Sequence, residues 1–104
     1  MYKTTLTIGL YDKDTCRQEI SSESAKNIVT AAVLRSGVYG ATVWDCRGIY
    51  TMQSTGEIVE EPSIRVEFCD DFQRDISGLV ADLKARLNQE SIMVERAISN
   101  VSFL

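Results

Sequence analysis

The sequence predicts an α+β domain in which strands and helices follow one another in the order β-α-β-β-α-β. Strand-like alternation and two separate helical stripes of apolar residues support this order. Two antiparallel-type strands joined by a short turn occupy the middle of the chain. The expected strands are 2–11, 41–52, 57–68 and 91–103, and the expected helices begin near 20–23 and near 70–72. The economical packing is a four-stranded antiparallel sheet with both helices on one face, the ferredoxin-like arrangement. Right-handed crossovers fix the strand order as 4-1-3-2.

The first strand and the first helix have clear sequence signals. Leu6, Ile8 and Leu10 alternate with polar residues, which is typical of a strand with one buried face. A serine before Glu23 can cap the free backbone N–H groups at a helix start. Gly37 is a stop signal, because glycine accepts the left-handed conformation that ends many helices.

Two residues interrupt the middle strands. Gly48 predicts a bulge or a close backbone approach in the second strand. Pro62 cannot donate a ladder hydrogen bond, so we expect it at an edge, a bulge or a non-bonded position. The turn between the strands covers residues 53–56.

The second helix and the last strand complete the pattern. We expect Asp70 or Asp71 to cap a helix whose apolar stripe runs from Phe72 to Leu87. Gly78 within that helix indicates close packing of its turn on the sheet. A change of parity in the last strand predicts a bulge or a bend near 96–99.

Composition indicates one globular domain, residues 1–104, and excludes several functions. The net charge of −4 argues against binding of nucleic acid, which favours a basic surface. The chain has no histidine, so a Ser-His-Asp triad and a His-bearing zinc site are excluded. Its three cysteines are widely spaced, and we expect reduced, at least half-buried thiols. We expect no metal, no cofactor, no membrane span or signal peptide, and a cytoplasmic location.

Short motifs resemble a known family. They are GATV at 40–43, the glycine at 48 after an aromatic strand, TGEIVEE at 55–61 and LNQESIMV at 87–94. Over residues 40–94 their layout is similar to the uncharacterised bacterial proteins of the DUF3574 type. The resemblance implies a ferredoxin-like fold, and it implies no activity because none is established for that group.

The candidate interaction surface is the sheet face that the helices leave uncovered. By parity its third strand contributes Glu61, Arg65 and Glu67. The second strand contributes either the set of Trp44, Cys46 and Tyr50 or the set of Asp45 and Arg47. A solvated face, a dimer interface and a small-molecule site all remain open. The residues selected as the candidate surface are Trp44, Arg47, Tyr50, Glu61, Arg65 and Glu67.

Two functions from different classes follow. We favour a small non-enzymatic protein, with no catalytic residues, that self-associates as a homodimer or binds another protein. One version is an acidic inhibitor from a phage or mobile element that engages a basic enzyme. The alternative is a small-molecule-binding or enzymatic domain, with a pocket between the open sheet face and a partner subunit that uses Trp44, Tyr50 and Arg65. The face on which Trp44 lies discriminates between the two, because a tryptophan buried under the helices could not anchor that pocket.

Overall fold

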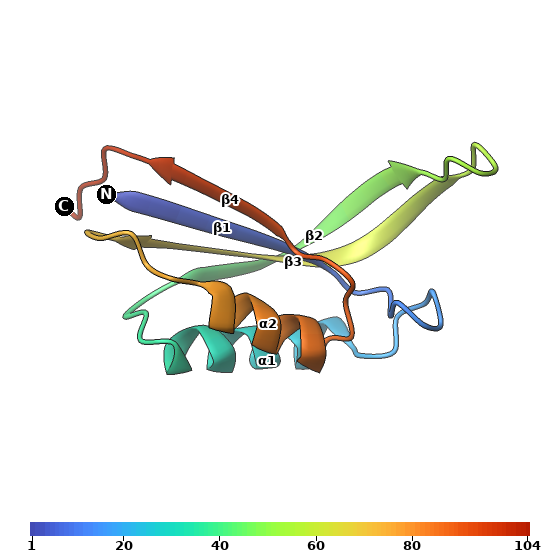
Figure 1. Cartoon of the computed structure of the whole chain (residues 1–104), viewed down its shortest axis with the longest axis horizontal. Coiled ribbons are helices and arrows are strands. Elements are labelled where there is room, and N and C mark those ends of the chain that lie inside the picture. The colour runs from blue at the N-terminus through green and yellow to red at the C-terminus, as the bar shows by residue number, and fades with distance from the viewer.

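A computed structural model describes all residues, 1–104, and has the predicted element order. The strands are β1 (Tyr2–Gly9), β2 (Thr42–Thr51), β3 (Ile58–Asp70) and β4 (Met93–Ile98), and the helices are α1 (Ser22–Arg35) and α2 (Ser77–Arg86). The four strands form one antiparallel sheet in the order β2-β3-β1-β4, which is the predicted order read from the other edge. Figure 1 shows both helices packed under one face of this sheet, so the ferredoxin-like α+β prediction is confirmed.

The core lies between the sheet and the helices. Alternate residues of the central strands, among them Leu6, Ile8, Ile64 and Val66, are fully buried against α1 and α2. Apolar residues of the helices, including Val29 and Leu83, fill the other side of the same cluster. This burial supplies the main stabilisation, because each such side chain contributes about 1.5–3 kcal/mol relative to an exposed position.

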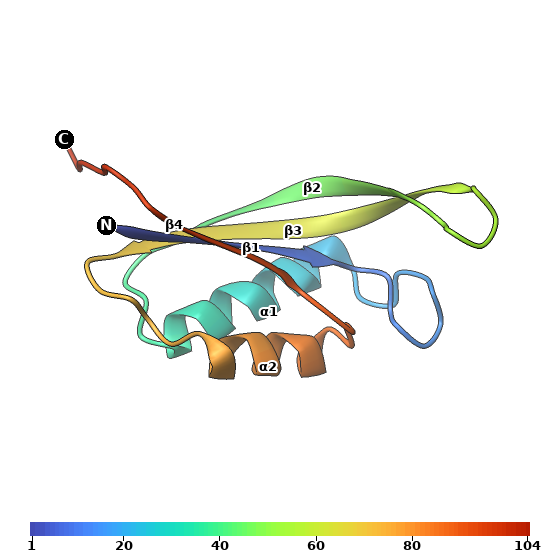
Figure 2. The same ribbon diagram turned by 45° about the horizontal axis from the view of Figure 1, so that its top comes forward.

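The hairpin of β2 and β3 extends beyond the helices as an arm (Figures 1 and 2). The molecule therefore measures 46 × 24 × 24 Å. The pairing of the two strands runs unbroken from Thr42 opposite Glu67 to Thr51 opposite Ile58. The bulge predicted at Gly48 is therefore wrong, since Gly48 pairs regularly with Glu61.

Pro62 explains where β1 ends. The strand stops at Gly9 rather than at the predicted residue 11. The Leu10 N–H donates to the Pro62 carbonyl at 2.9 Å, but Pro62 has no N–H to return the bond. The Tyr11 N–H instead donates to the carboxylate of Glu61 at 2.9 Å. Pro62 thus lies inside a central strand, at the position where its hydrogen bonding to β1 ends.

Helix α1 begins as predicted, with the Ser21 hydroxyl accepting from the Ser24 N–H at 3.1 Å. Helix α2 begins later than predicted, because Asp70 stays in β3 and its carboxylate binds Arg74 instead of capping a helix. The carboxylate of Asp75 then accepts from the Ser77 N–H at 3.0 Å. This backbone hydrogen bond lowers the pKa of Asp75, since it favours the charged form.

Two smaller predictions are also wrong. A Cβ atom at Gly78 would meet no atom within 4 Å, so that turn does not pack closely on the sheet. Strand β4 keeps one register against β1 and contains no bulge. The change of parity between Val94 and Ala97 falls inside this regular pairing, where every residue of β4 is exposed, and the strand ends at Ile98. Neither helix has the length and hydropathy of a membrane span.

Candidate site on the open face of the sheet

Strand pairing places Trp44 on the face opposite the helices. Trp44 lies directly across from Arg65, and Arg65 lies directly across from Thr7 on the other side. Ile64 and Val66, the neighbours of Arg65, are buried under the helices, so alternation puts Arg65 and its cross-strand partners on the open face. Of the two sets that the sequence left possible for the second strand, the structure therefore places Trp44, Cys46 and Tyr50 on the open face.

Arg65 is the cation at the centre of this face. Its guanidinium carbon lies 5.7 Å from the centroid of the Trp44 ring, within the range of a cation–π contact. The eight ion pairs of the structure do not include Arg65. Its Nε atom is buried and has no hydrogen-bond partner, and the same is true of the Thr7 hydroxyl. Two polar atoms on directly opposite residues are therefore unsatisfied.

Glu67 lies on the same face but is already engaged. Its carboxylate lies 3.3 Å from the Lys3 ammonium and accepts a 3.4 Å hydrogen bond from the Thr5 hydroxyl. Glu67 therefore forms its ion pair with Lys3 and not with Arg65.

Glu61 is held in a fixed position above Gly9. A Cβ atom built on Gly9 would lie 2.5 Å from a carboxylate oxygen of Glu61, so a larger residue at position 9 would move this carboxylate from its present place. The Tyr11 N–H fixes the same carboxylate. Burial, followed by the charge of Glu61, raises the pKa of Tyr50, which lies two residues along β2 from Gly48, the strand partner of Glu61.

Arg47 does not join the other candidates. It pairs with Pro62 and shares the opposite face of the arm with Asp45, which binds Lys26 of α1 at 3.0 Å. The guanidinium of Arg47 lies 3.3 Å from Glu60 on that face. Five of the six candidate residues thus share the open face, and Arg47 lies behind it.

Cys46 and Ser63 form the row next to Arg65. They pair directly across β2 and β3, and Ser63 is buried. Burial raises the pKa of the Cys46 thiol, and the charge of Arg65 partly offsets that rise. Cys46 and Cys69 are half-buried as expected, whereas Cys16 is exposed in a loop, and all three are free.

Gln89 and Asn88, just after α2, form hydrogen bonds to the loop that follows β1. Its amide donates to the Tyr11 carbonyl at 2.8 Å and to the Leu87 carbonyl at 3.2 Å. The neighbouring Asn88 adopts a positive φ of 48° and its amide donates to Asp12 at 2.9 Å and Asp14 at 2.8 Å. The hydrogen bond from Asn88 lowers the pKa of Asp12. These bonds tie the loop after β1 to the end of α2.

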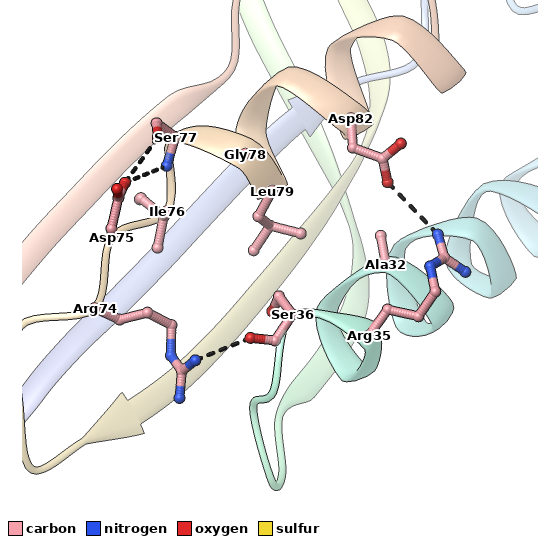
Figure 3. A pocket seen from close by; sticks show the side chains of 10 residues that line it. All are labelled: Ala32, Arg35, Ser36, Arg74, Asp75, Ile76, Ser77, Gly78, Leu79 and Asp82. Carbon is pink, nitrogen blue, oxygen red and sulfur yellow. Dashed lines mark hydrogen bonds and ion pairs between the residues drawn. The ribbon is translucent and has the colours of Figure 1, made fainter.

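A cavity of about 510 Å³ lies between the end of α1 and the start of α2 (Figure 3). Its two arginines are both engaged. Arg35 lies 3.5 Å from Asp82, and Arg74 donates to Asp70 at 2.8 and 3.1 Å and to the Ser36 carbonyl at 3.0 Å. Sequence reasoning missed the clamp of Asp70 and Arg74, although their i, i+4 spacing was a visible signal.

A second cavity, of about 640 Å³, lies beside the start of β2 and the end of β3 and has a mostly apolar lining that includes Tyr39, Val101 and Phe103. No group of three His, Cys, Asp or Glu side chains is arranged to hold a metal ion. The open face therefore remains the richest collection of unsatisfied polar and aromatic groups.

The fold and this face define a small ferredoxin-like α+β protein with a polar, aromatic sheet surface. The chain belongs to the DUF3574 family, described as a protein of unknown function, whose sequence profile matches residues 3–103. The match covers nearly the whole chain and confirms the resemblance first seen over residues 40–94.

Solved structures provide further similarities. The chain is 25% identical to a phage SAM lyase in complex with S-methyl-5′-thioadenosine, with a TM-score of 0.65, over 92% of this chain and 79% of that one. The periplasmic divalent cation tolerance protein CutA from Archaeoglobus fulgidus is 10% identical, with a TM-score of 0.62, over 99% and 88%. The B. subtilis GlnK–ATP complex is 11% identical, with a TM-score of 0.54, over 92% and 80%. CutA and GlnK support the fold alone. Comparison with curated protein sequences yields no match.

Proposed function

We propose that the protein binds S-adenosylmethionine on the open face of its sheet and acts on it as a lyase. The bond between the sulfonium sulfur and the amino-acid chain breaks, and its electron pair stays on the sulfur of the released S-methyl-5′-thioadenosine. The amino-acid part leaves as the second product, with a new ring or, after loss of one proton to water, a new double bond. The observation that carries this proposal is the likeness to the phage SAM lyase, because it combines the highest TM-score among the similarities above with 25% identity over 92% of the chain. It follows the small-molecule alternative that the sequence left open.

The chemistry of the open face suits this ligand. S-adenosylmethionine carries a sulfonium cation, which carboxylates and aromatic faces attract. Glu61 supplies a carboxylate that accepts from the Tyr11 N–H, and Tyr50 lies two residues along β2 from Gly48, the strand partner of Glu61. Trp44 offers a half-buried aromatic surface on which an adenine ring can stack.

A second copy of the chain would close the site. A single open sheet face covers only one side of a ligand, whereas small-molecule sites usually bury about 70–90% of the ligand surface. On the open face itself Tyr50 in the arm (45% exposed) and Met93 in β4 (61%) are large exposed side chains, which a second copy could cover. Self-association is therefore part of the proposal.

The test compares two neighbouring glutamates on opposite faces of the arm. Glu61→Gln keeps the size and hydrogen-bond acceptor of Glu61 but removes its charge, so it should weaken binding of S-adenosylmethionine about 10-fold or more. Glu60→Gln should leave binding unchanged, because Glu60 pairs with Arg47 behind the face. Calorimetry measures binding, and chromatography measures release of S-methyl-5′-thioadenosine. A wild-type protein that neither binds nor cleaves S-adenosylmethionine would contradict the proposal.

A second candidate is the non-enzymatic protein that works by self-association or by binding another protein. The exposed residues of the arm favour it, as does β4, in which every residue is exposed. Sedimentation at micromolar concentration tests it. A strict monomer that also retains no partner would rule it out, whereas a stable oligomer without nucleoside binding would favour it over the lyase.

We place the protein in the cytoplasm, where three free cysteines stay reduced. A phage or mobile-element origin also fits the likeness to a phage protein.

A further inference from the structure

Two unsatisfied donors belong to directly opposite residues at the centre of the open face. They are the buried Nε–H of Arg65 and the hydroxyl of Thr7, on residues that pair directly across β3 and β1. Directly opposite residues in an antiparallel pair place their Cβ atoms about 4.5–5.5 Å apart, close enough for both donors to reach one bound group. Buried polar atoms without partners are rare, so such a pair calls for an explanation.

The chain itself provides no partner for these donors. The nearest acidic residues along β3 are Glu67, which binds Lys3, and Glu61, which accepts from the Tyr11 N–H above Gly9. Trp44 covers the guanidinium of Arg65 from one side and so limits its orientations. The result is a cation in contact with Trp44 whose strand partner carries an unpaired hydroxyl, and such a pair of donors suits an anion with at least two oxygens.

We infer that Thr7 and Arg65 bind a carboxylate, namely that of the amino-acid part of the nucleoside ligand. This inference rests on the proposed function and adds that the site discriminates between nucleosides with and without the amino-acid carboxylate. S-adenosylmethionine and S-adenosylhomocysteine carry that carboxylate, whereas S-methyl-5′-thioadenosine lacks it. Arg65 would therefore hold the substrate by a group that the nucleoside product no longer has, which favours product release.

The experiment measures the affinity of S-adenosylhomocysteine and of S-methyl-5′-thioadenosine for the wild-type protein and for Arg65→Gln. Quenching of Trp44, the single tryptophan, reports binding of both. Arg65→Gln should weaken S-adenosylhomocysteine about 10-fold or more, because a hydrogen bond to a charged group is lost. Its effect on S-methyl-5′-thioadenosine should stay below about 3-fold, a difference smaller than one such bond.

Three further variants separate recognition from structure. Arg47→Gln is the matched control, an arginine on the opposite face of the same arm, and should change neither affinity. Arg65→Lys keeps the charge without the planar fork, so it should recover part of the loss. Thr7→Val should weaken S-adenosylhomocysteine selectively without lowering the melting temperature, since the hydroxyl has no partner to lose.

The outcomes are distinct. Equal weakening of both nucleosides by Arg65→Gln, or weakening of neither, would overturn the inference and leave the proposed function intact. A change of oligomeric state in Arg65→Gln, with the ratio of the two affinities unchanged, would assign the carboxylate to a second copy and would also overturn it. Failure of the wild-type protein to bind either nucleoside would overturn the proposed function and the inference together.

Discussion

The two faces of the sheet are built from the same strands but have opposite properties. On the helix face Leu6, Ile8, Ile64 and Val66 are fully buried in an apolar cluster. On the open face their immediate neighbours include Thr7 and Arg65, with polar atoms that are buried yet unpaired. The helix face stabilises the fold, whereas the open face retains interactions that the chain does not satisfy by itself. Each prediction below tests this contrast, from the largest effect to the smallest.

Truncation of a residue on the helix face should have the largest effect. Ile64→Ala removes a fully buried side chain and leaves a cavity, so the free energy of unfolding should fall by about 3 kcal/mol. Ser63→Ala, one residue earlier on the open face, removes only a hydrogen bond of 3.2 Å to the Glu61 carbonyl and should cost about 1 kcal/mol. Urea denaturation measures both. Equal losses would show that the two faces contribute alike.

Loss of the ion pair between Asp70 and Arg74 should lower the free energy of unfolding by a similar amount. Arg74→Ala leaves Asp70, only 8% exposed at its side chain, as a buried charge without its partner, at a cost of about 3 kcal/mol. Arg86→Ala is the control, because the pair of Arg86 and Asp82 is exposed and should contribute less than about 0.5 kcal/mol. Thermal unfolding of the two variants gives the comparison. A mild effect of Arg74→Ala would mean that water reaches Asp70 readily.

One residue on the helix face is an exception, because it too carries an unpaired polar atom, and it provides a third test. Thr4 is fully buried under the helices, yet its hydroxyl has no hydrogen-bond partner. Thr4→Val replaces that hydroxyl with a methyl group of similar size, so the free energy of unfolding should rise by about 1 kcal/mol. Denaturant unfolding checks it, and nucleoside binding should be unaffected. A loss of stability would indicate that the hydroxyl is hydrogen-bonded in solution.

The smallest effect concerns thiol reactivity on the open face. Burial raises the pKa of Cys46, so at about pH 8 its thiolate fraction should lie below that of a free cysteine, for which the pKa is about 8.5. Cys46 should therefore react slowly with a thiol reagent, and its rate should climb as the pH rises. Exposed Cys16 serves as the internal comparison. Because the charge of Arg65 lowers this pKa, Arg65→Gln should slow Cys46 further, and an increased rate would contradict the assignment.

Much of the fold could be predicted from sequence because it depends on local patterns. Alternation gave the strands and their faces, and the serine cap placed the start of α1 within a residue or two. The start of α2 could not be predicted in this way. The sequence suggested Asp70 as a helix cap, but its carboxylate accepts from Arg74. Arg74 is held there by a second bond, to the carbonyl of Ser36, which is distant in the sequence.

The candidate site was only partly predictable. Parity of β3 placed Glu61, Arg65 and Glu67 together, whereas the register of β2 was needed to separate Trp44 from Arg47. Nothing in the sequence indicated that Gly9 makes room for Glu61, because the two residues lie in different strands. Nor could the sequence distinguish the engaged carboxylate of Glu67 from the unpaired guanidinium of Arg65.

The contact between Gly9 and Glu61 has a consequence for how this chain can vary. Since a Cβ at position 9 would meet the carboxylate, a larger residue there would turn the end of the Glu61 side chain away from its present place. A relative with alanine at position 9 should therefore carry either a glutamate in another rotamer or a shorter residue at position 61. The pair would then serve as a genetic marker that separates relatives keeping the carboxylate on this face from relatives that have lost it.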